Sequence, residues 1–277
     1  MGKIFKMKEI KIWHLTDLHL DCGKLKLKKY PECDYVLITG DLASKLGGWG
    51  FIQDLLSKNY IVIFILGNHE YHSENRKGIK TYKEIEELWK RKSKEFENFH
   101  VLINDTIEFE DIRFIGSTLW TNLNNLDQET IDCFPEMRDS SKIYKSYYGS
   151  GYSRRGGRNI SATDLYDFHT KSVEFIEKEL QKEFKGLTIL GTHHAPLLES
   201  LDTRYKDSDS NGYYASDLSY LFEKYKINAA FHGHVHQSKH YYHKGTLITC
   251  NPRGYRMYNE VNSDFDEGKV IKLKKEL

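Results

Sequence analysis

The chain has only four cysteines and four prolines among its 277 residues, and no two cysteines form a C-x-x-C pair. This spacing provides neither a disulfide framework nor a zinc knuckle, and free thiols are typical of a reducing compartment. No stretch approaches the roughly 18 apolar residues that span a membrane. Residues 1–13 also lack the apolar stretch of a signal peptide. We therefore expect a cytoplasmic protein that does not associate with membranes.

The chain also has almost no net charge. Its 41 basic residues are balanced by 40 acidic residues, which leaves a net charge of +1. Processive binding of nucleic acid requires a broad basic face. The balance therefore does not favour nucleic acid as a partner, although it leaves that partner open. An anionic ligand would have to bind to a local cluster of side chains.

Short apolar runs alternate with segments of helical periodicity along the chain. The predicted strands lie at 10–15, 35–40, 61–67, 101–104, 112–120, 187–192, 227–233 and 246–250. The predicted helices lie at 51–56, 82–96, 165–184 and 216–225. Ser161, Thr163 and Ser216 are candidate helix caps. The alternation indicates an α/β fold, and the run TIEFEDIRFIG predicts one antiparallel hairpin.

Residues 121–160 interrupt this alternation. Within them, KIYKSYYGSGYSRRGGR at 142–158 has five basic residues and no acidic residue. Arg154 and Arg155 are candidates for gripping a phosphate group, and Tyr152 is a candidate for stacking on a base. A surface loop without such a role is the alternative. We expect a single domain spanning residues 1–277, with an inserted Tyr/Gly/Arg-rich loop region at about 121–160.

Five of the apolar runs are followed by side chains that can bind a metal ion. These side chains are Asp17 and His19, Asp41, Asn68 with His69 and Glu70, His193 and His194, and His234 and His236. Ligands of open α/β sheets bind beyond the carboxyl ends of the strands. Each fragment alone is a common turn or loop sequence. All five in order, each after a separate predicted strand, indicate a metal site.

The spacing within these motifs supports the same interpretation. In an extended chain, residues i and i+2 point to the same side, so both members of D-x-H or H-x-H can reach one ion. Gly40, Gly67 and Gly233 allow sharp turns and a close approach of the backbone. The donors are carboxylate, imidazole and amide oxygen, without a thiolate. This set suits manganese, iron or zinc.

The order of the motifs resembles that of the calcineurin-like metallophosphoesterases. Their pattern D-x-H, G-D, G-N-H-[DE], H, G-H-x-H reads here as DLH, GD, GNHE, HH and GHVH between residues 17 and 236. The stretches GSTLWTN, GTHHAP, YYASDL and CNPRGY are similar to those of an uncharacterised bacterial and phage subgroup. The resemblance implies a four-layer α/β/β/α fold, in which a two-sheet β-sandwich is flanked by helices. It also implies two divalent metal ions at the carboxyl ends of the strands. Manganese is the expected metal, with iron or zinc as alternatives.

The resemblance also implies a role for each motif residue. The implied ligands of the first metal are Asp17, His19 and His236, and those of the second are Asn68, His193 and His234. Asp41 would bridge both metals, and His69 would lie outside the metal shell near the leaving group, oriented by Glu70. His193 is chosen over His194 because it is the first histidine of the pair, while the residues alone leave both open.

These roles predict a dinuclear metal-dependent phosphoesterase. Two metals can share one water molecule, and the resulting hydroxide attacks phosphorus in line. The expected substrate is a small phosphodiester or phosphomonoester, with a nucleotide-like ester as one option. Arg253 follows an apolar run and is a candidate for substrate binding, with a structural arginine as the alternative. The natural substrate and the oligomeric state stay open.

Other functions are less consistent with the residues. A nuclease is disfavoured by the charge balance. In a phosphoprotein phosphatase of this superfamily the second motif continues as G-D-x-x-D-R-G, whereas Asp41 is followed by LASKLGG. A non-enzymatic scaffold tends to lose ligands or the site histidine, and this chain retains all of them.

The remaining histidines match no motif. His14 is expected in the core or beside the metal ligands, and His232 in either place. The others are expected at the surface, and they are His72, His100, His169, His240 and His243.

Overall fold

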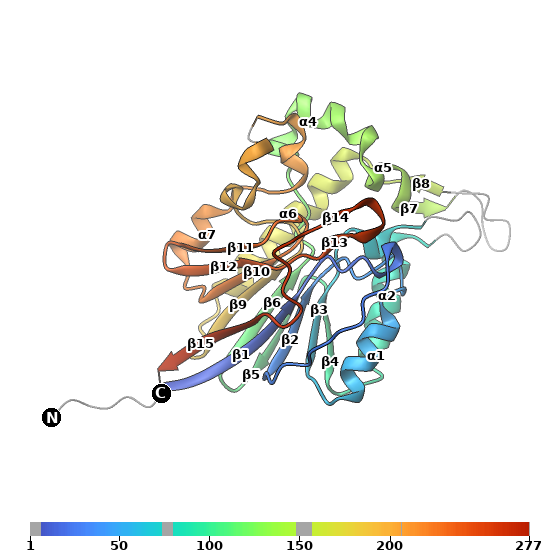
Figure 1. Ribbon diagram of the computed structural model, residues 1–277. Coiled ribbons are helices and arrows are strands. Elements are labelled where there is room, and N and C mark those ends of the chain that lie inside the picture. Colours follow the sequence, from blue (N-terminus) through green and yellow to red (C-terminus); the bar gives the residue numbers. More distant parts are fainter. Residues whose placement is uncertain (1–6, 74–79, 148–156, 206, 277) are drawn as a thin grey trace.

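The structure is a computed structural model, and it describes residues 7–73, 80–147, 157–205 and 207–276 (Figure 1). Arg154, Arg155 and Tyr152, the loop candidates for substrate binding, lie outside the described residues. None of the helices in the described part of the chain combines the length and the apolar character that crossing a membrane requires.

One sheet has five strands in the order β15-β1-β2-β3-β4. Their bounds are Val270–Glu276, Met7–Leu15, Tyr35–Thr39, Val62–Ile65 and Phe99–Leu102. Strands β1 to β4 are parallel neighbours, and β15 pairs antiparallel with β1 at the edge. The carboxyl ends of the four parallel strands therefore meet at one side of the sheet.

The other sheet has six strands in the order β11-β12-β10-β9-β6-β5. Their bounds are Lys239–His243, Thr246–Cys250, Ala229–His232, Leu187–Thr192, Ile112–Ser117 and Asp105–Phe109. The four central strands are parallel, and the edge strands β11 and β5 are antiparallel. The pairing of β5 with β6 confirms the antiparallel hairpin predicted around residues 106–116.

The two sheets pack face to face, and alternate residues of their strands fill the space between them. Ile63 and Ile65 of β3, Phe114 of β6 and Phe231 of β10 belong to this buried cluster. Neighbouring side chains point the opposite way, because successive side chains of a strand alternate. Both faces of each sheet are covered, and this explains why the strands read as near-continuous apolar runs.

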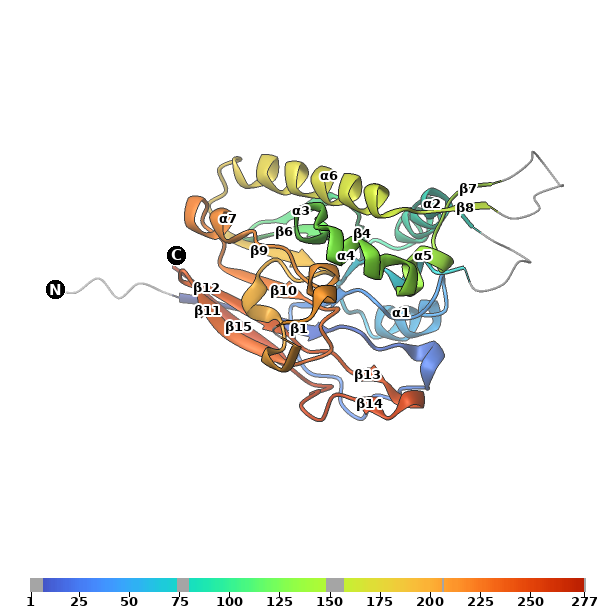
Figure 2. The same cartoon turned by 90° about the horizontal axis from the view of Figure 1, so that it is seen from above.

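Helices cover the outer faces of the two sheets. The main helices are α1 (Trp49–Ser57), α2 (Tyr82–Ser93), α6 (Ala162–Leu180) and α7 (Ser219–Lys224). Trp89 of α2 joins the cluster that contains Phe64 of β3, and Ile176 of α6 joins the cluster that contains Leu190 of β9. Figure 2 shows α6 running along one side of the molecule, over β6 and β9. The four layers α/β/β/α confirm the predicted fold class.

Short elements complete the structure around the carboxyl ends of the strands. They are α3 (Leu123–Leu126), α4 (Gln128–Cys133), α5 (Arg138–Lys142), β7 (Tyr144–Tyr147), β8 (Gly157–Asn159), β13 (Gly254–Tyr255) and β14 (Glu260–Val261). The 3₁₀ helices are η1 (Leu20–Cys22), η2 (His69–Tyr71), η3 (Phe134–Glu136), η5 (Leu198–Ser200), η6 (Thr203–Tyr205), η7 (Asp209–Tyr213) and η8 (Arg256–Tyr258). Figure 1 shows α4 and α5 on top of the sandwich.

Of the three candidate helix caps, one caps a helix in the structure. Ser161 caps α6 in a reciprocal capping box with Asp164, whereas Thr163 lies inside the helix. The prediction that Ser216 caps a helix is wrong, because α7 begins at Ser219. The Ser216 hydroxyl instead accepts the main-chain N–H of Asn122 at 3.2 Å.

Candidate metal centre

The motif residues meet where the carboxyl ends of both sheets come together. Asp17, Asp41 and Asn68 follow β1, β2 and β3 of the first sheet. His193 and the His234–His236 pair follow β9 and β10 of the second sheet. Three overlapping trios of side chains are close enough to hold a metal ion, and they are Asp17 with His19 and His236, His19 with Asp41 and His69, and Asp41 with His193 and His234.

The backbone of these loops is left-handed rather than extended. Positive φ angles occur at Asp17 (50°), His19 (42°), Asp41 (55°), His234 (68°) and His236 (45°). The expectation that i and i+2 converge through an extended backbone is therefore wrong. Main-chain bonds between loops hold the observed geometry, since Asp17 N–H donates to Gly40 O and His19 N–H donates to Asp41 O, both at 3.0 Å. Non-glycine residues in this region cost about 1–3 kcal/mol each and cluster at functional sites.

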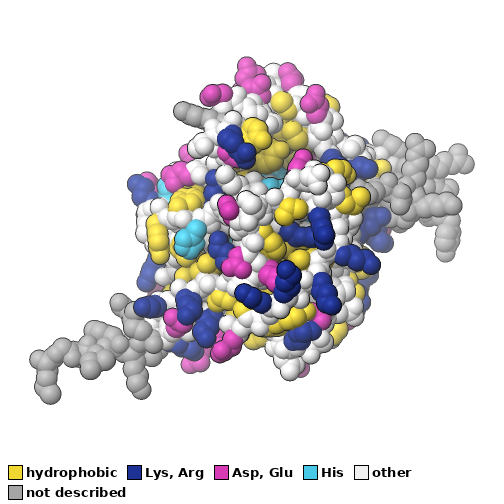
Figure 3. All heavy atoms as spheres, in the orientation of Figure 1, with side chains coloured by type: hydrophobic (Ala, Val, Ile, Leu, Met, Phe, Trp, Pro, Cys, Tyr) yellow, Lys and Arg dark blue, Asp and Glu magenta, His cyan; other side chains and the backbone are white. Residues whose placement is uncertain are grey.

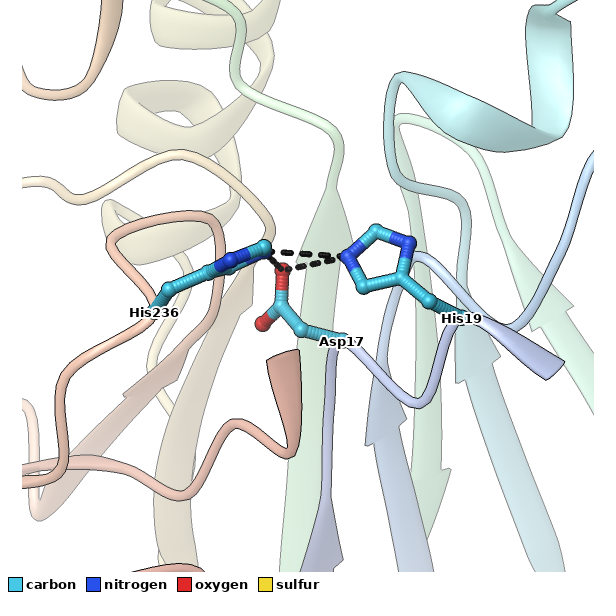
Figure 4. A group of neighbouring side chains, drawn as sticks. All are labelled: Asp17, His19 and His236. Carbon is cyan, nitrogen blue, oxygen red and sulfur yellow. Dashed lines mark hydrogen bonds and ion pairs between the residues drawn. The ribbon is translucent and has the colours of Figure 1, made fainter. Parts of the chain in front are cut away.

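The first trio brings two imidazoles and a carboxylate to one point (Figure 4). Nε2 of His236 lies 3.0 Å from Nε2 of His19 and 3.3 Å from Oδ1 of Asp17. Burial raises the pKa of Asp17, but the hydrogen bond and charge of His236 outweigh it and bring that pKa below its usual range. Burial lowers the pKa of His19 well below its ordinary value. Burial lowers the pKa of His236, but the Asp17 carboxylate outweighs it and raises that pKa. The trio therefore offers an ionised carboxylate and one neutral imidazole, that of His19, which are the forms that bind metal.

The His193 ring is fixed by a bond to the main chain. Its Nδ1–H donates to the carbonyl of Thr39 at 2.7 Å, so Nε2 points into the site. There Nε2 lies 2.9 Å from Oδ1 of Asn68 and 3.3 Å from Oδ1 of Asp41. Asn68 is oriented in turn, because its Nδ2 donates to Oδ1 of Asp139 at 2.9 Å.

Nε2 of His193, Oδ1 of Asn68 and Oδ1 of Asp41 thus face one another. All three carry lone pairs that repel one another, so a proton or a metal ion is needed between them. Burial lowers the pKa of His193, but the Asp41 and Asp17 carboxylates raise it to about 10 overall. The field that favours a proton on this nitrogen equally favours a divalent cation among His193, Asn68 and Asp41. The donor set therefore fits a metal ion.

Asp41 lies between the two groups of side chains. Its Oδ1 accepts the main-chain N–H of His69 at 2.9 Å and faces His193. Its Oδ2 is 3.8 Å from Nε2 of His19. The two carboxylate oxygens therefore point toward different trios, as a bridging ligand requires.

His194 lies beside the candidate ligands and lines the same cavity, with its ring centroid 4.2 Å from that of His234. Its Nδ1–H donates to the carbonyl of Thr118 at 3.1 Å, and its ring centroid is 5.5 Å from that of Trp120. Burial lowers the pKa of His194 to about 3. Nε2 of His193 faces Asn68 and Asp41, and His193 rather than His194 forms a trio with Asp41 and His234, which favours His193 as the metal ligand.

His69 and Glu70 have separate surroundings. Nε2 of His69 is 2.8 Å from the hydroxyl of Tyr255 and 3.8 Å from Oδ2 of Asp41. The Glu70 carboxylate accepts the main-chain N–H groups of Gly67, Leu42 and Asp41 at 2.7, 2.8 and 2.9 Å. Glu70 was expected to orient His69, whereas the bonds of its carboxylate hold together the two loops that carry Asp41 and Asn68.

Arg253 was a candidate for substrate binding, with a structural arginine as the alternative, and its side chain is buried in the protein. It donates to the carbonyls of Leu18, Gly23 and Lys24 at 2.8, 2.7 and 3.1 Å. This arrangement corresponds to the structural alternative. It ties the segment after β12 to the loop that follows Asp17.

Two of the histidines expected at the surface are buried, so that expectation is wrong for them. Nε2 of His72 is 2.7 Å from Oδ1 of Asp139. His169 donates from Nδ1 to the carbonyl of Leu119 at 3.2 Å. His14 and His232 are buried as well, bonded to the hydroxyls of Thr39 and Ser200.

Sequence reasoning missed Asp139 and Tyr255. Asp139 lies in the segment without clear periodicity, where no local signal marks a buried carboxylate. Tyr255 lies in the CNPRGY stretch, which marked the family resemblance without indicating a role for the tyrosine.

A cavity of about 950 Å³ is lined by several of the candidate metal ligands. Asp41, Asn68, His69, His234 and His236 form its inner end. Its other lining residues include Arg138, Tyr205, Tyr213, Tyr214 and Glu260. The cavity is within the size range of small-molecule sites.

Three comparisons relate the chain to known proteins. A family model described as calcineurin-like phosphoesterase matches residues 10–238. The chain is 29% identical over 272 residues to "Uncharacterized protein L509" of Acanthamoeba polyphaga mimivirus, covering 87% of this chain and 90% of that protein. The crystal structure of phosphopantetheinyl hydrolase (PptH) from Mycobacterium tuberculosis superimposes with a TM-score of 0.66 at 15% identity, covering 96% of this chain and 95% of that one. The last comparison shows that the two proteins share a fold.

Proposed function

The chain belongs to the calcineurin-like phosphoesterases, as its motif order predicted, and from this membership we propose that it hydrolyses a small phosphate monoester or diester at a dinuclear metal centre. The family establishes a metal-dependent hydrolase of phosphate esters in general. The observation that carries the finer proposal is the convergence of lone-pair atoms from five loops, fixed by the bonds from His193 to Thr39 and from Asn68 to Asp139.

Seven side chains would hold the two cations. The proposed ligands of the first are Asp17, His19 and His236, those of the second are Asn68, His193 and His234, and Asp41 serves both. When bound, two divalent cations neutralise phosphate charge and lower the pKa of a water molecule at the site. The oxygen and nitrogen donors support manganese, with iron or zinc as alternatives.

His69 is proposed to act on the leaving group. Its ring is buried at the inner end of the cavity, and burial lowers the pKa of His69 to about 4. A bound phosphate would raise that pKa, because a negative charge beside an imidazole favours the protonated form. His69 could then donate a proton to the departing oxygen, a contribution of about 10²–10⁴-fold in rate.

The cavity supports a substrate with a bulky or aromatic group. Tyr205, Tyr213 and Tyr214 line its wall, and aromatic faces can stack on a base. In Figure 3 basic and acidic side chains are interspersed over the visible face, with acidic side chains gathered over α4 at the top. That surface supports a small ester over a long nucleic acid.

The function is tested with a panel of esters on the manganese-loaded protein. The panel contains bis-p-nitrophenyl phosphate, p-nitrophenyl phosphate, cyclic nucleotides, dinucleotides and a phosphopantetheine diester. The last is included because the protein with the similar fold carries that name. Short DNA and a phosphopeptide test the nuclease and phosphoprotein phosphatase alternatives.

Two variants test the assignment of roles. We expect Asp41→Ala to lose both bound metal and activity, because Asp41 faces both trios. We expect His69→Ala to retain metal and lose about 10²–10⁴-fold in turnover. Full activity and two bound metals in Asp41→Ala would refute the assignment.

A further inference from the structure

The hydroxyl of Tyr255 contacts the histidine that we assign to the leaving group. Tyr255 lies on β13, which pairs with β14. Its position is fixed from the metal-ligand loop, because Gly254 N–H donates to Asp17 O at 3.0 Å and Arg253 N–H donates to Thr16 O at 3.2 Å. Gly254 has a φ of +80°, and a Cβ there would lie 2.3 Å from the carbonyl of Glu260. Only glycine therefore allows this approach.

The ring of Tyr255 packs inside the site. Its centroid is 4.1 Å from the ring of His19, with the planes 31° apart, and 4.8 Å from the ring of His236. This packing directs the hydroxyl to Nε2 of His69, at 2.8 Å. Tyr255 is thus held by groups other than His69, and it can fix that imidazole.

Nε2 of His69 can either bind a metal ion or form a hydrogen bond. The ring lies between His72 and His19, with centroid distances of 4.4 and 4.5 Å. From that place Nε2 could join His19 and Asp41 as a third metal ligand, since these three side chains form one of the candidate trios. The alternative is the hydrogen bond to Tyr255, which occupies the same nitrogen.

We propose that Tyr255 is the positioning residue of His69, holding Nε2 in a hydrogen bond at the inner end of the cavity so that the imidazole serves the leaving group instead of a metal ion. The inference rests on the proposed function, because it assumes that His69 acts on the departing oxygen. In that step the bond between phosphorus and the leaving oxygen breaks and its electron pair stays on that oxygen. The proton on Nδ1 of the protonated His69 neutralises it, while Nε2–H donates to the Tyr255 hydroxyl, and the imidazole is left neutral. Tyr255 keeps the imidazole in place for this transfer.

The contact itself is tested without metal or substrate. Histidine side chains are labelled with ¹⁵N in the metal-free protein, and the His69 signal is assigned with His69→Asn. We expect Tyr255→Phe to shift the ring signals of His69, because Phe keeps the ring packing and removes only the hydroxyl. The matched control is Tyr258→Phe, a nearby exposed tyrosine whose hydroxyl is 3.5 Å from Nη2 of Arg138. An unchanged His69 signal in Tyr255→Phe would overturn the inference.

The role is tested with esters of different leaving groups. Departure of p-nitrophenolate needs little protonation, whereas departure of phenolate or an alkoxide needs much more. For Tyr255→Phe we expect kcat to fall by at least about tenfold on a phenyl or alkyl ester and by less than about twofold on the p-nitrophenyl ester, with KM unchanged. Combined with His69→Ala, Tyr255→Phe should have no further effect. An equal loss on both esters, or a further loss in the double variant, would overturn the role.

The two arms separate the possible failures. A wild-type protein that hydrolyses no ester would refute the proposed function and with it the leaving-group role. A His69 signal that still shifts in Tyr255→Phe would then leave the contact standing. Active wild-type protein with an unshifted signal would refute the inference alone.

Discussion

Replacing Gly67 by alanine should disrupt the metal centre. A Cβ at Gly67 would lie 2.1 Å from Oδ1 of Asp41, 2.6 Å from the main-chain nitrogen of Asp41 and 2.7 Å from Cε1 of His193. Ordinary contact begins at 3.4 Å, so the Asp41 carboxylate or the loop must yield by about 1.3 Å, the difference between 3.4 and 2.1 Å. The added methyl group therefore acts on the side chain that we expect to bridge both metals.

The expected loss of metal affinity follows from how little displacement a metal site tolerates. Functional constellations must be held within about 0.5 Å of their productive geometry, and disturbing the groups that orient metal ligands typically costs about 10–100-fold in metal affinity. Overpacking costs a further ~1–3 kcal/mol of stability. We expect Gly67→Ala to bind manganese at least about tenfold more weakly and to melt several degrees lower.

The assay is calorimetric titration of the metal-free protein with manganese, together with thermal unfolding. Gly50→Ala is the matched control, because a Cβ at Gly50 in α1 would have no heavy atom within 4 Å. Alanine in a helix is favoured over glycine by about 1 kcal/mol, so the control should bind manganese normally and melt slightly higher. Two metal sites of unchanged affinity in Gly67→Ala would refute the reasoning.

Two further predictions concern the orientation and the presence of the metals. Asp139→Ala should lower the manganese affinity of one of the two proposed sites by about 10–100-fold, because Asn68 loses the acceptor of its Nδ2. Calorimetric titration should still find the other site at its normal affinity. Two sites of unchanged affinity would contradict this prediction. Removing metal with a chelator should lower the melting temperature, because a ligand at 100 times its Kd stabilises a protein by about 2.7 kcal/mol. Adding manganese back should restore the melting temperature, and identical melting with and without chelator would contradict a bound metal.

The alternation of strands and helices could be read from local patterns, whereas the four layers were implied by the family resemblance. The runs at 35–40 and 187–192 became β2 and β9, because strands covered on both faces need apolar residues in both orientations. The segments at 82–96 and 165–184 became α2 and α6, because apolar residues at helical spacing bury one face. The position of the candidate metal-ligand motifs at the strand ends was also readable, since they follow β1, β2, β3, β9 and β10.

The details of the site depended on contacts between distant segments. Asp17 and His19 were expected on an extended chain, but bonds to Gly40 and Asp41 hold them in the left-handed region. Ser216 has the residue type of a helix cap, yet its hydroxyl accepts from Asn122 instead. These partners are distant in the sequence, so the residues around Asp17, His19 or Ser216 do not predict them.

The amino-acid order of this chain was enough to predict its secondary-structure periods, its layered architecture, its family and the side chains that can bind metal. Only the folded structure showed that His193 contacts Asn68, that His72 is buried and that Tyr255 lies against His69. Periodicity and motifs are properties of neighbouring residues, whereas the direction of a side chain in a shared site depends on which loops pack against it.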